Sequence, residues 1–284
     1  MIPSQFDYVA PQTVEEALAA LAAGGDDAKV LAGGHSLLPI LRLRMNTPEQ
    51  IIDLGRIEAL RGVAEEGDAV VIGATATHDE VMRHPLVKEH AGLLSQTLGQ
   101  VGDPQVRHRG TVGGALVHAD PAGDVGTAAL ALDAEMVIAG PSGSRTVTAQ
   151  DFFVGLFESA VGEDELLVQI RIPKHTGWGG HYEKFIRTAQ QWSIVAVAAT
   201  VRVDAGSIAD ARVALTNMGA TPLRARSVEQ ALIGQPPSPE VVRAAAAAAA
   251  EGTAPPSDLN GQADYRQHLA GVLTRRAVLA AAGV

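Results

Sequence analysis

Two glycine-rich stretches carry the residue types and the spacing that could bind a phosphate group. The first is Ala32-Gly33-Gly34-His35-Ser36, and the second is Thr111-Val112-Gly113-Gly114. Because successive glycines lack a Cβ atom, the backbone can turn its N–H groups to one side and form a concavity that binds anions. Two such stretches, far apart in the sequence, could close on one diphosphate from opposite sides. This favours a dinucleotide cofactor over a mononucleotide.

The common nucleotide-binding motifs are absent from both stretches. Neither continues into the Gly-Lys-Ser/Thr of a Walker loop, and the Gly-x-Gly-x-x-Gly spacing of a Rossmann nicotinamide site is missing. His118-Ala119-Asp120 has no third ligand at a suitable spacing, so we predict no metal site. No Ser-His-Asp set or general acid–base pair stands out, and we therefore predict no catalytic residue.

Three other features have two interpretations each. The run Arg107-His108-Arg109 is either a local source of positive potential or a solvated basic turn. Asp124 could cap a helix that begins at Val125 or bind cofactor hydroxyl groups, and the two roles are compatible. Trp192 precedes an apolar strand, where a tryptophan usually fills a domain interface; a ring close to a flat cofactor is the alternative.

The composition limits the classes of function. The chain has 284 residues, a hydrophobic content of 46% and a formal net charge of −10, a sign that disfavours nucleic acid as a partner. It has no cysteine, so it cannot hold an iron–sulfur cluster through thiolates or use a thiol nucleophile. The sequence shows neither an apolar run of about 20 residues, the length that spans a bilayer, nor a secretory signal. We therefore expect a cytoplasmic protein without a transmembrane segment.

Hydrophobic periodicity and turn signals predict three successive parts. Residues 1–56 are expected to form an α/β lobe, residues 57–173 a second, α+β lobe, and residues 177–284 an antiparallel sheet with helices. Within the lobes we expect Ser36 to cap a helix over residues 37–43. We also expect one helix over residues 84–99, and both glycine stretches to join a strand to a helix.

Four segments occur together in register and resemble one known family. They are Ala32–Pro39, Gly73–His78, Gly110–Gly114 and Gln191–Val195. Together they resemble the FAD-binding medium subunit of molybdenum hydroxylases, the group that contains carbon monoxide dehydrogenase and xanthine dehydrogenase. The resemblance covers essentially the whole chain, and the combination is far more specific than either glycine stretch alone.

The resemblance implies an α+β fold and a noncovalent FAD site. A two-lobed FAD-binding domain of the vanillyl-alcohol oxidase/MurB type would be followed by a C-terminal domain that covers the flavin. Histidine carries FAD covalently in some proteins of this fold, but the family binds it noncovalently. Matched by motif, the cofactor-binding residues would be Ala32, Gly33, Gly34, His35, Ser36, Leu37, Val101, Thr111, Val112, Gly113, Gly114, Asp124, Leu167, Lys184 and Trp192.

The resemblance also implies partners and an electron-transfer function, most like those of carbon monoxide dehydrogenase. A large subunit would carry the molybdenum cofactor, and a small subunit would carry two [2Fe–2S] clusters that deliver electrons to this FAD. The absence of cysteine fits clusters held by another chain. A dimer of heterotrimers, a quinone or other acceptor, and a cytoplasmic location or a peripheral one at the inner membrane are expected. Carbon monoxide, an aldehyde, a purine or an N-heterocycle could be the substrate of the large subunit.

Two other functions are compatible with the residues themselves. A stand-alone FAD oxidoreductase with its own organic substrate would need a general base beside the flavin, and none stands out. A non-redox scaffold would use the glycine stretches only as turns.

Overall fold

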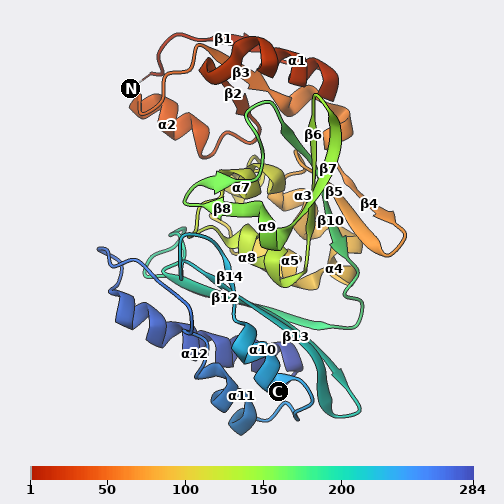
Figure 1. Cartoon of the computed structure of the whole chain (residues 1–284), viewed down its shortest axis with the longest axis vertical. Coiled ribbons are helices and arrows are strands. Elements are labelled where there is room, and N and C mark those ends of the chain that lie inside the picture. Colours follow the sequence, from red (N-terminus) through yellow and green to blue (C-terminus); the bar gives the residue numbers. More distant parts are fainter. Residues whose placement is uncertain (1) are drawn as a thin grey trace.

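The computed structural model describes residues 2–284, whose three larger sheets follow one another along the long axis of the molecule (Figure 1). The N-terminal residues lie at one end, and the C-terminal helices lie at the other. None of the helices in residues 2–284 is long and apolar enough to cross a membrane.

The first sheet is small and parallel. Its strands stand in the order β1-β3-β2, with helices α1 and α2 beside them. The hydroxyl of Thr13 accepts a hydrogen bond from the N–H of Glu16 at 3.1 Å, which caps α1 as the sequence pattern indicates. The elements are β1 (Asp7–Val9), α1 (Val14–Gly24), β2 (Ala28–Leu31), α2 (Leu37–Leu43) and β3 (Gln50–Asp53), followed by two short 3-10 turns, Leu54–Arg56 and Glu58–Leu60.

The predicted cap of α2 is wrong. Ser36 has a helical backbone (φ −95°, ψ −46°), and its side chain makes no capping hydrogen bond. The N–H of Leu38 donates instead to the carbonyl of Gly34 at 2.9 Å. Because Gly34 has a φ of +79°, the turn into α2 is made by the glycine and not by a serine hydroxyl.

The second sheet has five antiparallel strands in the order β4-β5-β10-β6-β7. Helices pack beside it, and together they enclose the largest apolar cluster of the chain. The strands are β4 (Val63–Glu66), β5 (Ala69–Gly73), β6 (Glu135–Gly140), β7 (Gly143–Thr148) and β10 (Leu166–Pro173), with the two-stranded β8 (Phe153–Gly155) and β9 (Glu158–Ser159) separate. The helices are α3 (His78–Arg83), α4 (Pro85–His90), α5 (Gly92–Gly99), α6 (Pro104–Arg107), α7 (Val112–His118), α8 (Asp124–Ala131) and α9 (Ala149–Phe152).

The single helix expected over residues 84–99 is wrong, since α4 and α5 are separate. The backbone leaves the helical region at Ala91 (φ −142°, ψ 45°), whose side chain is fully buried. Gly92 follows, and glycine is a poor helix former. Tertiary packing of Ala91 therefore overrides the helical pattern on either side.

The C-terminal part is an antiparallel sheet with helices. Side chains of β12 (Val195–Asp204) alternate between the two faces of this sheet, as in any strand. Val195 and Val197 lie in the apolar cluster shared with α12, whereas Ala196 and Ala198 belong to the cluster that contains α8. Small side chains on that face allow α8 to approach. The elements are β11 (Gly179–Phe185), β12 (Val195–Asp204), β13 (Ser207–Thr216), β14 (Leu223–Arg224), α10 (Arg226–Leu232), α11 (Pro239–Ala246) and α12 (Ala263–Ala282), with strand order β11-β12-β13-β14.

Candidate cofactor site

The two glycine stretches lie together, although the sequence separates them widely. A Cβ on Gly33 would be 2.3 Å from the backbone oxygen of Arg109, and one on Gly113 would be 2.5 Å from that of Ala74. Real Cβ atoms do not approach backbone oxygens so closely. The glycines therefore allow chain segments that are far apart in the sequence to pack backbone against backbone.

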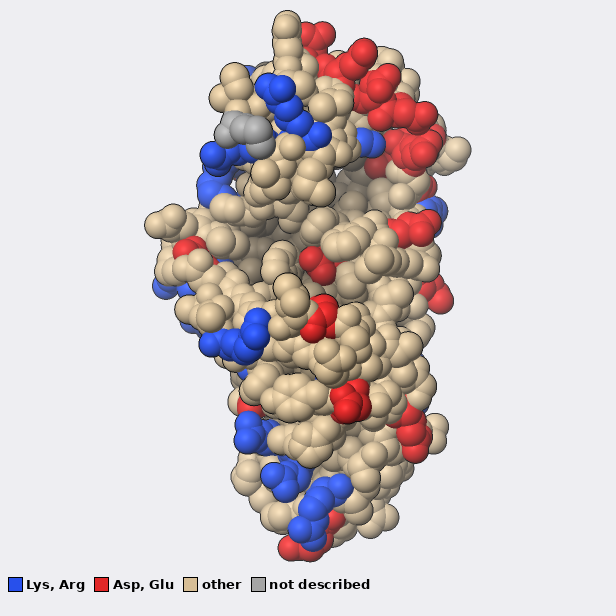
Figure 2. Space-filling view, turned by 90° about the vertical axis from the view of Figure 1, so that its left-hand side faces the viewer, with Lys and Arg blue, Asp and Glu red and all other residues tan. Residues whose placement is uncertain are grey.

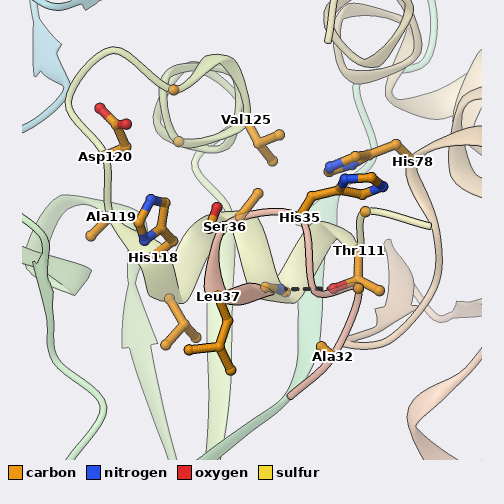
Figure 3. Close-up of a pocket in the computed structure, with 18 of the residues that line it drawn as sticks. Ala32, His35, Ser36, Leu37, His78, Thr111, His118, Ala119, Asp120 and Val125 are labelled. Atoms are coloured by element: carbon orange, nitrogen blue, oxygen red, sulfur yellow. Dashed lines mark hydrogen bonds between the residues drawn. The ribbon is translucent and has the colours of Figure 1, made fainter. Parts of the chain in front are cut away.

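The second glycine stretch does not join a strand to a helix, so this prediction is wrong. It follows α6 and begins α7, and Thr111 forms an isolated antiparallel bridge with Thr77. The hydroxyl of Thr111 accepts a hydrogen bond from the N–H of Gly114 at 3.2 Å, which caps α7 (Figure 3). The hydroxyl residue beside the glycines thus shapes the loop locally.

A cavity of about 520 Å³ lies between the glycine stretches and the elements that face them. Figure 2 shows the surface hollowed below the end of the molecule that carries the first sheet. Most of the predicted cofactor residues line this cavity. They are Ala32, Gly33, Gly34, His35, Ser36, Leu37, Thr111, Gly113, Gly114, Asp124, Leu167, Lys184 and Trp192.

Two of the predicted residues lie outside the cavity lining. Val112 is 1% exposed and belongs to the apolar cluster of the middle sheet, and Val101 packs against the same cluster. The basic run before the second glycine stretch also lies outside the lining. Within it, the guanidinium of Arg107 donates to the carbonyl of Val101 at 2.9 Å, a contact that is structural.

Asp124 is the first residue of α8, with Gly123 as the N-cap, so the predicted capping role at Val125 is wrong. Its buried carboxylate accepts three hydrogen bonds from the C-terminal part of the chain. Tyr182 and Ser193 donate to Oδ1 at 2.6 and 2.7 Å, and Lys184 donates to Oδ2 at 2.7 Å. The Lys184 side chain is 4% exposed, and this ion pair is buried on both sides. The cavity therefore has a neutralised pair of charges in its wall.

Trp192 is 55% exposed and lines the cavity, so it does not fill a domain interface. It stands between Gln191, which also lines the cavity, and the fully buried Ser193. An exposed aromatic ring at the edge of a cavity can cover a flat ligand. The structure therefore places Trp192 at the edge of the cavity, and its contact with a flat cofactor stays a prediction.

Sequence reasoning missed His78 as a site residue, although the segment Gly73–His78 was part of the resemblance. His78 is 4% exposed and lines the cavity, beside His35 (Figure 3). Its Nδ1 atom has no hydrogen-bond partner among residues 2–284. Burial lowers the pKa of His78 to about 4, and the neighbouring His35 and Arg107 side chains act in the same direction. The imidazole is therefore neutral at pH 7.

The residues present fit a dinucleotide better than a metal ion. The cavity has the volume of an organic ligand site and combines apolar side chains with a few polar groups. Its glycine stretches leave backbone where side chains would otherwise project. Among residues 2–284, no group of three or more His, Asp or Glu side chains could hold a metal ion.

Comparison with known proteins identifies two family domains. Residues 4–175 match the FAD binding domain in molybdopterin dehydrogenase, and residues 180–281 match the CO dehydrogenase flavoprotein C-terminal domain. The chain is 42% identical to the carbon monoxide dehydrogenase medium chain of Hydrogenophaga pseudoflava, over 99% of this chain and 98% of the relative. It is 35% identical to the glyceraldehyde dehydrogenase medium chain of Sulfolobus acidocaldarius, over 98% of each.

A solved structure extends the likeness to three dimensions. A chain of the carbon monoxide dehydrogenase from H. pseudoflava, solved without the Mo-pyranopterin moiety of its cofactor, matches with a TM-score of 0.97 and 44% identity. The match covers 100% of this chain and 99% of that one. The expected two-part architecture, an FAD-binding domain followed by an antiparallel sheet with helices, is confirmed. The chain therefore belongs to the family of FAD-binding medium subunits of molybdenum hydroxylases, and it resembles the carbon monoxide dehydrogenase medium chain over its full length.

Proposed function

We propose that this chain is the electron-transfer subunit of a carbon monoxide dehydrogenase-like complex. In this role it receives electrons from the [2Fe–2S] clusters of a small subunit, after substrate oxidation by a molybdenum-bearing large subunit, and passes them to a quinone or a similar acceptor. The observation that carries the proposal is the full-length likeness to a carbon monoxide dehydrogenase chain, with a TM-score of 0.97. The absence of cysteine agrees with clusters held elsewhere.

The cavity described above is the proposed FAD site. Residues 32–37 and 111–114 would hold the pyrophosphate, and Asp124, Leu167, Lys184 and Trp192 would contact other parts of the cofactor. Residues 1–56 and 57–173 would act as the two lobes, with residues 177–284 as the cover. Bound FAD would supply one- and two-electron chemistry. The protein contributes binding, exclusion of water and the placement of the Asp124–Lys184 charges.

The substrate of the complex is set by the large subunit in this proposal. The relatives with similar sequences include a carbon monoxide dehydrogenase and a glyceraldehyde dehydrogenase, so medium chains of one fold occur with different substrates. The ionisable groups that line the cavity include a buried ion pair and a neutral histidine. We assign none of them a role as acid or base toward an organic substrate.

Purification of the complex from its native host through a tag on this chain tests the proposal. We expect two further subunits, molybdenum, iron and FAD in fixed ratios, and a mass that corresponds to a dimer of heterotrimers. Substrate should reduce the flavin in the complex but not in the isolated chain. A chain that purifies without partners and turns over an organic substrate would instead support the stand-alone oxidoreductase. If no preparation of the chain contained flavin, the result would support the non-redox scaffold instead.

Incubation of the tagged complex with quinone-containing vesicles tests which acceptor it uses and whether it associates with membranes. We expect reoxidation of the reduced flavin by a soluble quinone analogue, and association with native membrane fractions only when all subunits are present. Reoxidation by oxygen alone, with no response to quinone, would contradict the proposed acceptor.

A further inference from the structure

Two residues outside the cavity donate hydrogen bonds to one residue in its wall. Tyr182 and Ser193 do not line the cavity, yet both hydroxyl groups donate to Oδ1 of Asp124, which does. Lys184, also in the lining, donates to Oδ2 of the same carboxylate and to the carbonyl of Gln100 at 3.1 Å. Each Asp124 oxygen thus has its own donors.

The arrangement depends on the C-terminal sheet. Tyr182 and Lys184 are two residues apart on β11, so their side chains project from the same face of the sheet, toward α8. Ser193 precedes β12, and its backbone carbonyl accepts a hydrogen bond from the amide of Asn217 at 2.8 Å. Tyr182 is 3% exposed and Ser193 is 1% exposed. Both hydroxyl groups are therefore held in place by packing.

The hydroxyl donors matter because the carboxylate is buried. A buried carboxylate stays ionised only when partners replace the water that it loses. Hydrogen bonds from neutral donors spread its negative charge without adding a charge of their own. Burial, together with the neighbouring Asp124 carboxylate, raises the pKa of Tyr182 well above its ordinary value, so that this group remains a donor.

We propose that Tyr182 and Ser193 are positioning residues that hold the Asp124–Lys184 pair in the cavity wall and thereby set the reduction potential of the flavin bound there. The inference rests on the proposed FAD site. Reduction adds negative charge to a flavin, so the potential depends on how completely nearby protein charges are neutralised. Loss of either hydroxyl leaves more of the Asp124 negative charge exposed to the cavity. The site then binds the reduced flavin less tightly relative to the oxidised flavin, and the midpoint potential of the flavin falls.

The variants Tyr182→Phe and Ser193→Ala test this in the purified complex. FAD content is measured after acid extraction. The flavin midpoint potential is measured by redox titration, with the spectrum of the flavin-depleted complex subtracted. We expect unchanged FAD content and a lower potential in each variant. The ratio of reduced to oxidised flavin dissociation constants should rise about tenfold, which for a two-electron couple is about 30 mV. The double variant should show a larger shift.

Two further variants separate positioning from general loss of packing. Thr200→Val removes a hydroxyl that is 2% exposed on β12, where it donates to the carbonyl of Gly179 and does not contact Asp124. We expect it to leave the potential unchanged. Ser193→Thr keeps the hydroxyl and should restore the potential lost in Ser193→Ala. If Tyr182→Phe does not assemble, the two Ser193 variants carry the test.

Two outcomes would overturn the inference. One is an unchanged potential in Tyr182→Phe and Ser193→Ala while both variants retain FAD. The other is loss of FAD from these variants with normal loading of Thr200→Val, which would make the hydroxyl groups necessary for cofactor retention and not for its potential. Absence of flavin from the unmodified complex is a different result, since it would contradict the proposed function itself.

Discussion

The cavity has two walls that are built on different principles. The glycine wall, formed by residues 32–36 with Thr111, Gly113 and Gly114, depends on backbone segments that approach at distances that no side chain permits. The charged wall, formed by Asp124 and Lys184 with Tyr182 and Ser193 behind them, depends on buried polar side chains from segments far apart in the sequence. The glycine wall should therefore be sensitive to added volume, and the charged wall to lost charge balance. Both walls line one cavity, the proposed FAD site.

The largest effect is expected in the charged wall. Lys184→Met leaves the buried Asp124 carboxylate without its counter-ion, which costs roughly 3–5 kcal/mol of folding stability. Chemical denaturation of the full chain measures it. The double variant Asp124→Asn/Lys184→Met removes both charges and should recover part of the loss. Equal stabilities of the single and double variants would mean that charge balance does not hold this wall together.

Added volume should damage the glycine wall next. A Cβ on Gly113 would lie 2.5 Å from the backbone oxygen of Ala74, so Gly113→Val forces the backbone apart at a cost of about 3 kcal/mol. Gly92→Ala is the matched control, because a Cβ there meets nothing within 4 Å. It should be neutral or slightly stabilising in the same denaturation experiment. Equal free energies of unfolding for the two variants would contradict the distinction between the walls.

Beside the glycine wall, the cavity is lined by a buried titratable group, His78, whose effect on stability depends on pH. Its pKa is lowered to about 4 in the folded chain from an ordinary value of 6.5. His78 therefore binds a proton more readily in the unfolded chain than in the folded one. Its contribution to the free energy of unfolding is fully present above pH 6.5 and is lost as the pH decreases toward 4. The loss should be about 2 kcal/mol at pH 5 relative to pH 7. His78→Gln should flatten this slope in denaturation curves collected between pH 4 and 7; an unchanged slope would assign it to other groups.

The smallest effect on stability is expected at Trp192, next to the charged wall. Because this side chain is 55% exposed, Trp192→Ala should change the free energy of unfolding by less than about 0.5 kcal/mol. The complex should nevertheless release FAD more readily on dilution, by a few-fold, as measured by flavin fluorescence in the filtrate. A large loss of stability with firm FAD binding would reverse the interpretation of this residue.

The residues that could be predicted from the sequence belong mostly to the glycine wall. The glycine wall is made from short contiguous segments, so its motifs are visible in the sequence, and every residue of 32–36 lines the cavity. Val112 was predicted from the same motif, but it points into the apolar cluster, because successive residues of a helix face different directions. The role of His78 at the cavity depends on its burial, which no local pattern reveals.

The sequence by itself determined the family, the cofactor class and most of the secondary structure, because these depend on local motifs, periodicity and the absence of cysteine. Only the tertiary structure decided the break at Ala91, the contact of the two glycine stretches and the donors around Asp124. The physical reason is that these features depend on the burial of groups from distant segments. A carboxylate at position 124 could have bound a ligand hydroxyl or a protein side chain, and only the packing of the C-terminal sheet against α8 brought Tyr182 and Lys184 to it as partners.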